Sequence, residues 1–119
     1  MTLVLAVALA GGLGALARFL LDGTVSTTVP AEFPTGTFVV NVSGALILGL
    51  LAGASLEGDT LTIAATGVLG SYTTFSTWML ESQRLGEDGE FEVMALNLAL
   101  SVAAGLVAVW AGRELGGLL

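Results

Sequence analysis

The chain has 119 residues, of which 55% are hydrophobic, a formal net charge of −7, and neither cysteine nor histidine. The lack of cysteine excludes disulfides and thiolate metal sites, and the lack of histidine removes the usual general base, so we do not expect an enzyme. Ten acidic residues against three arginines and no lysine also exclude the basic patch that nucleic-acid binding requires.

Four stretches of about twenty residues, almost free of charge, fill most of the chain. They are 2–21, interrupted only by Arg18, and then 35–54, 61–80 and 93–112. About twenty apolar residues in a helix cross the roughly 30 Å hydrocarbon layer of a bilayer. We therefore expect residues 1–119 to form a single four-span domain, all-α and multi-pass in the cell membrane.

The first span carries two features that need an interpretation. Ala15-Leu16-Ala17 resembles a signal-peptide cleavage site, but no positive residue precedes the apolar run, so we expect the span to be retained. Arg18 is the one charge inside a span, where insertion costs about 2.5–3.5 kcal/mol. It either snorkels from the span end to the interface or serves an ion path, and its sign favours an anion.

The second and fourth spans repeat a polar spacing. Thr37 and Asn41 lie four residues apart, and so do Asn97 and Ser101, which places each pair on one helix face. Together they line a polar track, or they are hydrogen-bond contacts between helices. Pro34 suits the first turn of the second span.

From Gly67 to Trp78 the third span contains two glycines and five serine or threonine residues. This composition predicts a broken helix around Gly70–Thr73, and freed carbonyls there would be ligands for a small cation. The alternative is that the hydroxyls bond to the preceding turn and the helix stays continuous.

Phe75 and Trp78 lie three residues apart, on one face just after the predicted break. The positive edge of an aromatic ring can face a small anion. The alternative is that both rings are packing residues.

Small residues recur at four-residue spacing in three spans, at Ala10 and Gly14, at Gly49 and Gly53, and at Ala104, Ala108 and Gly112. In lipid, such residues allow close approach of helix backbones. The pattern indicates either packing within one chain or a dimer face.

The arginines do not fix an orientation in the membrane. With four spans, Arg113 lies on the side of the termini, whereas Arg84 and Arg18 lie toward the other side. One charge against two is a weak bias under the positive-inside rule. The chain is therefore compatible with insertion in both orientations, which permits an antiparallel homodimer.

Three motifs in this order resemble the Fluc/CrcB fluoride channel family. They cover the first three spans, and the fourth is similar mainly in hydropathy and length. The motifs are Gly11-Gly12-x-Gly14-Ala15-xx-Arg18, Phe33-Pro34-Thr35-Gly36-Thr37-xxx-Asn41-xx-Gly44, and Gly67-xx-Gly70-xx-Thr73-Thr74-Phe75-Ser76-Thr77.

The resemblance implies a passive fluoride channel that exports cytoplasmic fluoride through two pores of a dual-topology antiparallel homodimer. It implies a structural Na⁺ at the dimer centre, held by carbonyls of Gly70 and Thr73 from both chains. The implied pore residues are Asn41, Phe75, Ser76, Trp78, Thr37 and Ser101, with Arg18 and Glu81 at the vestibule. Trp78 stands where the family usually has a second phenylalanine, and Asn97 stands where some members have a tyrosine.

Two other functions and one other assembly are compatible with four short spans. A proton-coupled multidrug transporter needs a carboxylate in the first span, and the acid expected nearest, Asp22, is predicted to lie outside it. A scaffold subunit would explain the small-residue faces but not the polar motifs. A heteromer with a homologous chain is a variant of the channel.

Overall fold

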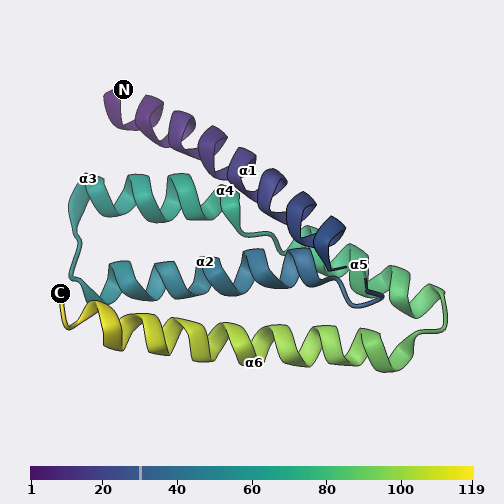
Figure 1. Ribbon diagram of the computed structural model, residues 1–119. Coiled ribbons are helices and arrows are strands. Elements are labelled where there is room, and N and C mark those ends of the chain that lie inside the picture. The colour runs from purple at the N-terminus through teal and green to yellow at the C-terminus, as the bar shows by residue number, and fades with distance from the viewer. Residues whose placement is uncertain (30) are drawn as a thin grey trace.

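The computed structural model describes residues 1–29 and 31–119 and contains helices and no strands within them (Figure 1). The segments are α1 (Thr2–Thr28), α2 (Thr35–Gly53), α3 (Gly58–Leu61), the π-helix η1 (Thr62–Leu69), α4 (Gly70–Tyr72), α5 (Ser76–Glu87) and α6 (Phe91–Gly116). The prediction of an all-α protein is confirmed.

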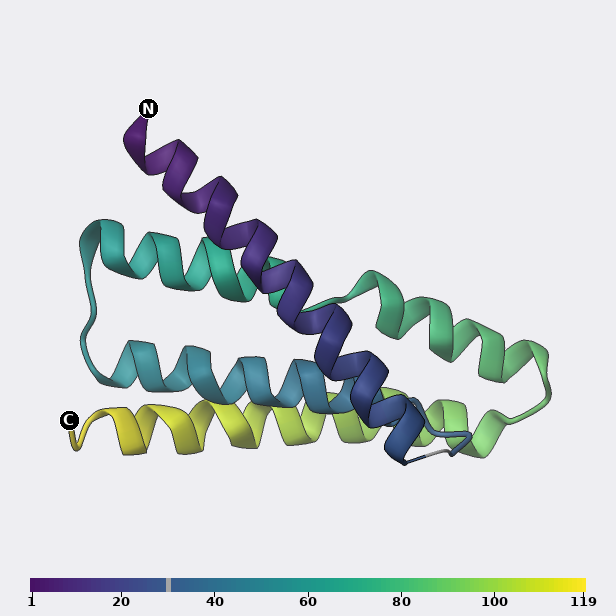
Figure 2. The same cartoon turned by 45° about the horizontal axis from the view of Figure 1, so that its top comes forward.

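Helices α2 and α6 lie side by side along their length, and α1 crosses the α3–η1–α4 run diagonally (Figures 1 and 2). The two termini and the α2–α3 connection lie at one end of the molecule. The α1–α2 and α5–α6 connections lie at the other end, which is the arrangement expected for four spans with both termini on one side.

Helix α1 is longer than the predicted span 2–21, because it continues to Thr28. The hydroxyls of Thr24 and Thr27 donate to the carbonyls of Leu20 and Gly23 at 2.7 and 2.9 Å. Each hydroxyl therefore has a hydrogen-bond acceptor within α1, and these polar residues do not interrupt the helix. The first acidic residue, Asp22, therefore does not end the helix, and Arg18 lies well inside it rather than near its end.

The predicted third span, 61–80, is broken, so the continuous-helix alternative is wrong. Thr73 has an extended backbone (φ −80°, ψ 159°), and the helix resumes only at Ser76. Gly70 remains helical (φ −61°, ψ −32°). The break therefore covers Thr73–Phe75, at the end of the Gly70–Thr73 segment where we predicted it.

The connection between the third and fourth spans is short. Helix α5 reaches Glu87, and α6 begins at Phe91. Between them Gly89 adopts a φ of +77°, a conformation that glycine reaches without steric cost. The other two predicted spans agree closely with α2, and with α6 apart from a few extra residues at each end.

Glycines bring α2 and α6 into backbone contact. A Cβ atom added to Gly49 would lie 2.3 Å from the carbonyl oxygen of Val109, and one added to Gly112 would lie 2.2 Å from that of Leu46. Gly14 of α1 meets the carbonyl of Val68 in η1 at 2.2 Å in the same way. The small-residue motifs in these helices therefore serve packing within one chain.

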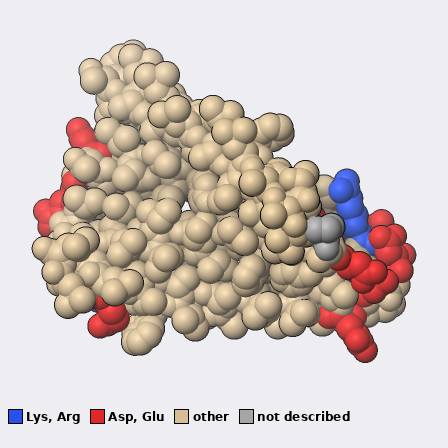
Figure 3. Space-filling view, viewed as in Figure 1, with Lys and Arg blue, Asp and Glu red and all other residues tan. Residues whose placement is uncertain are grey.

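On the face shown in Figure 3, charged side chains gather at the two ends of the molecule, and the surface between them is uncharged. Exposed leucines along α1 and α6, such as Leu9, Leu13 and Leu106, contribute to the uncharged surface between the two ends. In the described part of the chain, three helices, α1, α2 and α6, are long and apolar enough to cross a membrane. The third span reaches comparable length only as the sum of its pieces.

We predict that Gly49→Ala destabilises the protein by roughly 1–3 kcal/mol, because the added methyl group must push α6 away from α2. The measurement is equilibrium unfolding in detergent micelles. Gly105→Ala is the matched control, since a Cβ atom added to Gly105 meets nothing within 4 Å. Equal stability of the two variants would contradict the assigned backbone contact.

Candidate functional site

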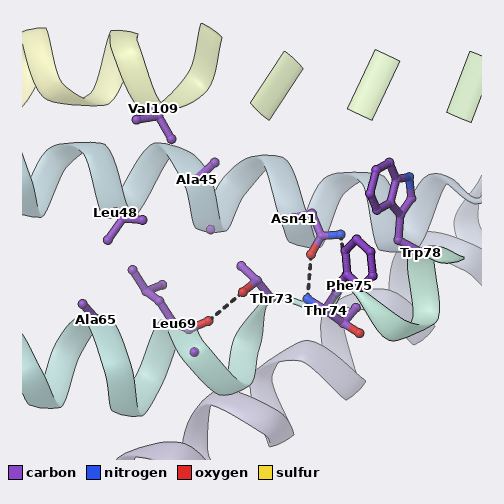
Figure 4. Close-up of a pocket in the computed structure, with 12 residues that line it drawn as sticks. Asn41, Ala45, Leu48, Ala65, Leu69, Thr73, Thr74, Phe75, Trp78 and Val109 are labelled. Atoms are coloured by element: carbon purple, nitrogen blue, oxygen red, sulfur yellow. Dashed lines mark hydrogen bonds between the residues drawn. The ribbon is translucent and has the colours of Figure 1, made fainter. Parts of the chain in front are cut away.

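The break in the third span lies beside a hollow of about 390 Å³ between α2, η1, α5 and α6 (Figure 4). The hollow brings together five of the residues predicted from the sequence, Asn41, Gly70, Thr73, Phe75 and Trp78. Its other lining residues are Gly44, Ala45, Leu48, Ala65, Leu69, Thr74 and Val109.

Asn41 holds the break together. Its Nδ2 donates to the carbonyl of Thr74 at 2.9 Å, and its Oδ1 accepts from the Thr74 N–H at 2.8 Å (Figure 4). The side-chain amide thus replaces both backbone hydrogen bonds that Thr74 loses where the helix opens. Lipid offers no such partners, so a break in a membrane helix requires them from the protein.

The hydroxyls at the break complete its hydrogen bonding. Thr73 directs both its N–H and its Oγ1 to the carbonyl of Leu69, at 3.0 and 2.9 Å. Oγ1 of Thr74 accepts from the Thr77 N–H at 3.2 Å, which caps the start of α5.

The carbonyls of Gly70 and Thr73 are different. Within residues 1–29 and 31–119, neither accepts a backbone N–H from the chain beyond the break. Both residues line the hollow, which is also lined by the apolar residues Leu48, Ala65 and Val109. Two carbonyl groups are therefore available for a ligand at this place.

The two aromatic rings form an edge-to-face pair, with centroids 5.6 Å apart and planes at 71°. Phe75 is 70% exposed, so packing inside this chain does not account for it. Trp78 is half-buried, and its Nε1 donates to the backbone carbonyl of Asn97 at 3.3 Å.

A second polar contact joins α2 to α5. Thr37, only 2% exposed, donates through Oγ1 to a carboxylate oxygen of Glu81. Beside it, Arg18 is half-buried and lines a smaller hollow of about 130 Å³. That hollow is also lined by Phe19, Asp22, Thr37, Val40, Thr74 and Thr77.

The structure divides the polar residues that we expected to form one track. Asn41 faces the break, whereas Asn97 is 1% exposed and donates through Nδ2 to Oγ of Ser82 at 2.9 Å. Ser101 Oγ donates to Asn97 Oδ1 at 3.3 Å. The sequence reasoning missed Ser82, although it lies one helical turn after Trp78. Ser76 is exposed at the first turn of α5, with its Oγ 3.4 Å from Oγ1 of Thr74.

We predict that Asn41→Leu opens the break, because it leaves the N–H and the carbonyl of Thr74 without partners. Amide exchange in the segment 73–77, followed by mass spectrometry in micelles, is expected to accelerate about tenfold or more. Thr35→Val is the control, since this hydroxyl of the same helix bonds only to the carbonyl of Phe33 among the described residues. Unchanged exchange in Asn41→Leu would show that the break does not depend on this amide.

Known proteins resemble the chain over almost its whole length. The family described as "CrcB-like protein, Camphor Resistance (CrcB)" matches residues 5–113. A relative from Mycolicibacterium paratuberculosis, named fluoride-specific ion channel FluC 2, is 46% identical over 113 residues, which are 95% of this chain and 93% of the relative. A protein of the same name from Mycobacterium tuberculosis is 49% identical over 107 residues, covering 90% and 85% of the two chains.

The fluoride-specific ion channel FluC of Geobacter sulfurreducens is 45% identical over 117 residues, covering 94% of each chain. These relatives are ion channels rather than enzymes, which agrees with the expectation drawn from composition. Together with the apolar helices, they identify a multi-pass membrane protein. The chain belongs to the CrcB family, as its three sequence motifs predicted.

Proposed function

We propose that the protein is a passive, fluoride-selective channel that lets cytoplasmic fluoride leave the cell and so lowers its toxicity. The observation that carries the proposal is the exposed ring of Phe75 at the helix break that Asn41 stabilises by its hydrogen bonds to Thr74. The relatives named fluoride-specific ion channels, which are 45–49% identical to this chain, support the same function. A negative-inside potential drives anion exit by about 2.3 kcal/mol per charge per 100 mV, so no fuel is required.

The groups at the break suit a small, hard anion. The Asn41 amide has two N–H donors, and only one is used within the described chain, by the carbonyl of Thr74. The exposed hydroxyl of Ser76 supplies a further donor, and Phe75 presents a positively polarised ring edge. Such donors replace the hydration shell of fluoride without a positive charge that would retain it.

Further positions along the path are proposed on the same basis. Thr37 and Ser101 supply hydroxyls, and Glu81 marks the vestibule through its contact with Thr37. Arg18 supplies positive charge beside the same contact, where it attracts anions.

The unit that conducts is proposed to be a dual-topology antiparallel homodimer of the four-span chain, residues 1–119. The weak arginine bias supports insertion in both orientations. The hollow beside the break is also lined by apolar residues, among them Leu48, Ala65 and Val109. A heteromer with a homologous chain is the alternative outcome of the experiments below.

A structural Na⁺ at the centre of this dimer is a further part of the proposal. The carbonyls of Gly70 and Thr73 fit it, because they lack backbone partners beyond the break in the described chain. Carbonyl oxygens are ligands that small hard cations accept, and a cluster of them is costly in a low dielectric without a cation. The ion would neutralise these dipoles where the chain provides no lysine.

The experiment that tests the channel is anion efflux from liposomes containing only this purified chain. With a cation carrier present to dissipate the potential, we expect rapid fluoride release while chloride stays inside. Equal release of both anions would refute selectivity, and efflux that needs a proton gradient would indicate a coupled transporter. No efflux from a well-folded chain would indicate an obligate heteromer or a scaffold.

The same efflux assay compares two variants of the aromatic pair. Phe75→Ile keeps an apolar side chain but removes the ring edge, so fluoride flux is expected to collapse while the dimer persists. Trp78→Phe keeps a ring and restores the residue that is commoner in the family, so flux is expected to persist. Unchanged flux in Phe75→Ile would assign Phe75 to packing alone.

The proposed cation is tested by the structure of the assembly. A crystal structure of the protein prepared in Na⁺ is expected to show one ion on the two-fold axis, coordinated by carbonyl oxygens of Gly70 and Thr73 from both chains. Replacing Na⁺ by a large organic cation is expected to lower the thermal stability, because the carbonyl dipoles then repel one another. A parallel dimer would refute this arrangement, and so would a stability independent of Na⁺.

A further inference from the structure

Tyr72, the one tyrosine of the chain, is the last residue of α4, which ends where the backbone opens. It lies between Gly70 and Thr73, whose carbonyls are the proposed ligands of the cation. Its side chain is 9% exposed and belongs to a buried cluster with Val40 of α2 and Leu69 of η1. The tyrosine side chain therefore anchors the backbone segment that carries both ligands.

A chain of two hydrogen bonds attaches the Tyr72 hydroxyl to α2. This hydroxyl lies 2.8 Å from Oγ of Ser43, and Ser43 Oγ donates to the carbonyl of Val40 at 3.0 Å. A serine hydroxyl has one proton, and Ser43 uses it for the Val40 carbonyl. Tyr72 is therefore the donor of the bond between the two hydroxyls, and Ser43 is its acceptor.

A glycine of α2 contacts the same segment beside this bond. A Cβ atom added to Gly44 would lie 2.3 Å from Cγ2 of Thr73 and 3.3 Å from Cδ1 of Tyr72. Two neighbouring residues of α2, Ser43 and Gly44, thus contact two neighbouring residues at the break. The ligand segment is seated directly on α2.

The segment needs such an attachment, because its own helix is short. Helix α4 has three residues, Gly70–Tyr72, between the π-helix η1 and the break, and a single helical turn has little stability by itself. The Asn41 amide bonds to the Thr74 peptide, which comes after both ligands. Carbonyl dipoles directed at one place repel one another until a cation binds. Without an anchor, the two ligands would move apart before the ion arrives.

We propose that Ser43 and Tyr72 are positioning residues for the structural Na⁺ of the proposed function, on which this inference rests. Their hydrogen bond holds the two ligand carbonyls near their binding positions while the site is empty. Binding then requires less ordering of the segment, and the affinity for the ion rises. Gly70 and Thr73 remain the ligands, and Tyr72 acts through the backbone that it shares with them.

A purely structural role of this bond predicts a different result. A cation that binds the folded protein stabilises it by an amount set by its concentration and its Kd. A bond that supports only the fold changes the stability measured without Na⁺ and leaves the half-saturating Na⁺ concentration where it was. A bond that positions the ligands raises that concentration when it is removed.

Ser82 provides the matched control. Its Oγ donates to the carbonyl of Trp78 at 2.8 Å and accepts from Nδ2 of Asn97 at 2.9 Å, so it makes the same two kinds of bond as Ser43. These bonds lie beyond the break and join α5 to α6. They involve neither ligand of the cation.

The test measures thermal unfolding in micelles while Na⁺ replaces a large organic cation at constant ionic strength. Tyr72→Phe, which keeps the ring, and Ser43→Ala are each expected to raise the half-saturating Na⁺ concentration about tenfold. The double variant is expected to match the single variants, because both changes remove the same bond. Ser82→Ala is expected to lower the stability and to leave the half-saturating concentration unchanged.

The single tyrosine gives a second, spectroscopic readout of the bond. With carbon-13 at the ring carbon that bears the hydroxyl, Ser43→Ala is expected to shift the tyrosine signal, because the hydroxyl loses its acceptor. Ser82→Ala is expected to leave this signal in place. Should Ser43→Ala fail to fold, Tyr72→Phe still decides, since it keeps the packing of the ring and removes only the hydroxyl.

An unmoved half-saturating concentration in Tyr72→Phe would overturn the proposal, as would an equal rise in Ser82→Ala. An unchanged tyrosine signal in Ser43→Ala would overturn it too, because the bond would then be absent. If the stability of the parent chain does not depend on Na⁺, the proposed cation site fails and this inference fails with it. Fluoride efflux tests the channel separately, so its failure leaves the Na⁺ result standing.

Discussion

The pairing of one side-chain amide with one peptide group is the interaction on which the site depends. Asn41 gives Thr74 both the donor and the acceptor that an unbroken helix would have supplied. In a bilayer an N–H or carbonyl without a hydrogen-bond partner costs several kcal/mol, so the opened backbone of the third span depends on this amide. The exposed Phe75, the restart of α5 at Ser76 and the free carbonyls upstream all follow from the opened backbone.

Glycine contacts bring Asn41 to the place where it can act. A Cβ atom added to Gly44, one turn after Asn41, would lie 2.3 Å from Cγ2 of Thr73, so α2 approaches the break as closely as its backbone allows. The contacts of Gly49 and Gly112 fix α2 against α6 farther along. In lipid, this packing substitutes for a hydrophobic driving force between helices. The small residues that let the helices approach closely therefore also bring Asn41 within hydrogen-bonding distance of Thr74.

The sequence alone predicted the helical class and the membrane-spanning stretches, because hydropathy is a local signal. It left the third span open between a broken and a continuous helix, since composition does not show whether Thr74 finds hydrogen-bond partners on another helix. It placed the end of α1 too early at Leu21, since a charge such as Asp22 marks a change of polarity and does not interrupt backbone hydrogen bonding. It also grouped Asn41 with Asn97 as one track. Spacing gives the face of a helix on which a residue lies, but only the packed structure shows which neighbour that face meets. Ser82 was missed for the same reason.

The two asparagines of the chain act on opposite sides of the same short segment. Asn41 bonds to the Thr74 peptide that precedes α5, and Asn97 contacts Trp78 in the first turn of α5. The Asn97 backbone carbonyl accepts from the indole Nε1, and its side chain donates to Ser82 Oγ, which donates to the Trp78 carbonyl. A site built on an unwound backbone loses the rigidity that a helix normally provides, and two side-chain amides from different helices, Asn41 half-buried and Asn97 buried, restore it. Because one amide comes from α2 and the other from α6, and these helices are locked together by glycine contacts, the segment carrying Phe75 is held to one rigid pair. An opened helix can then present a ring edge and a hydroxyl in fixed positions, which is the condition for telling a small anion from a larger one.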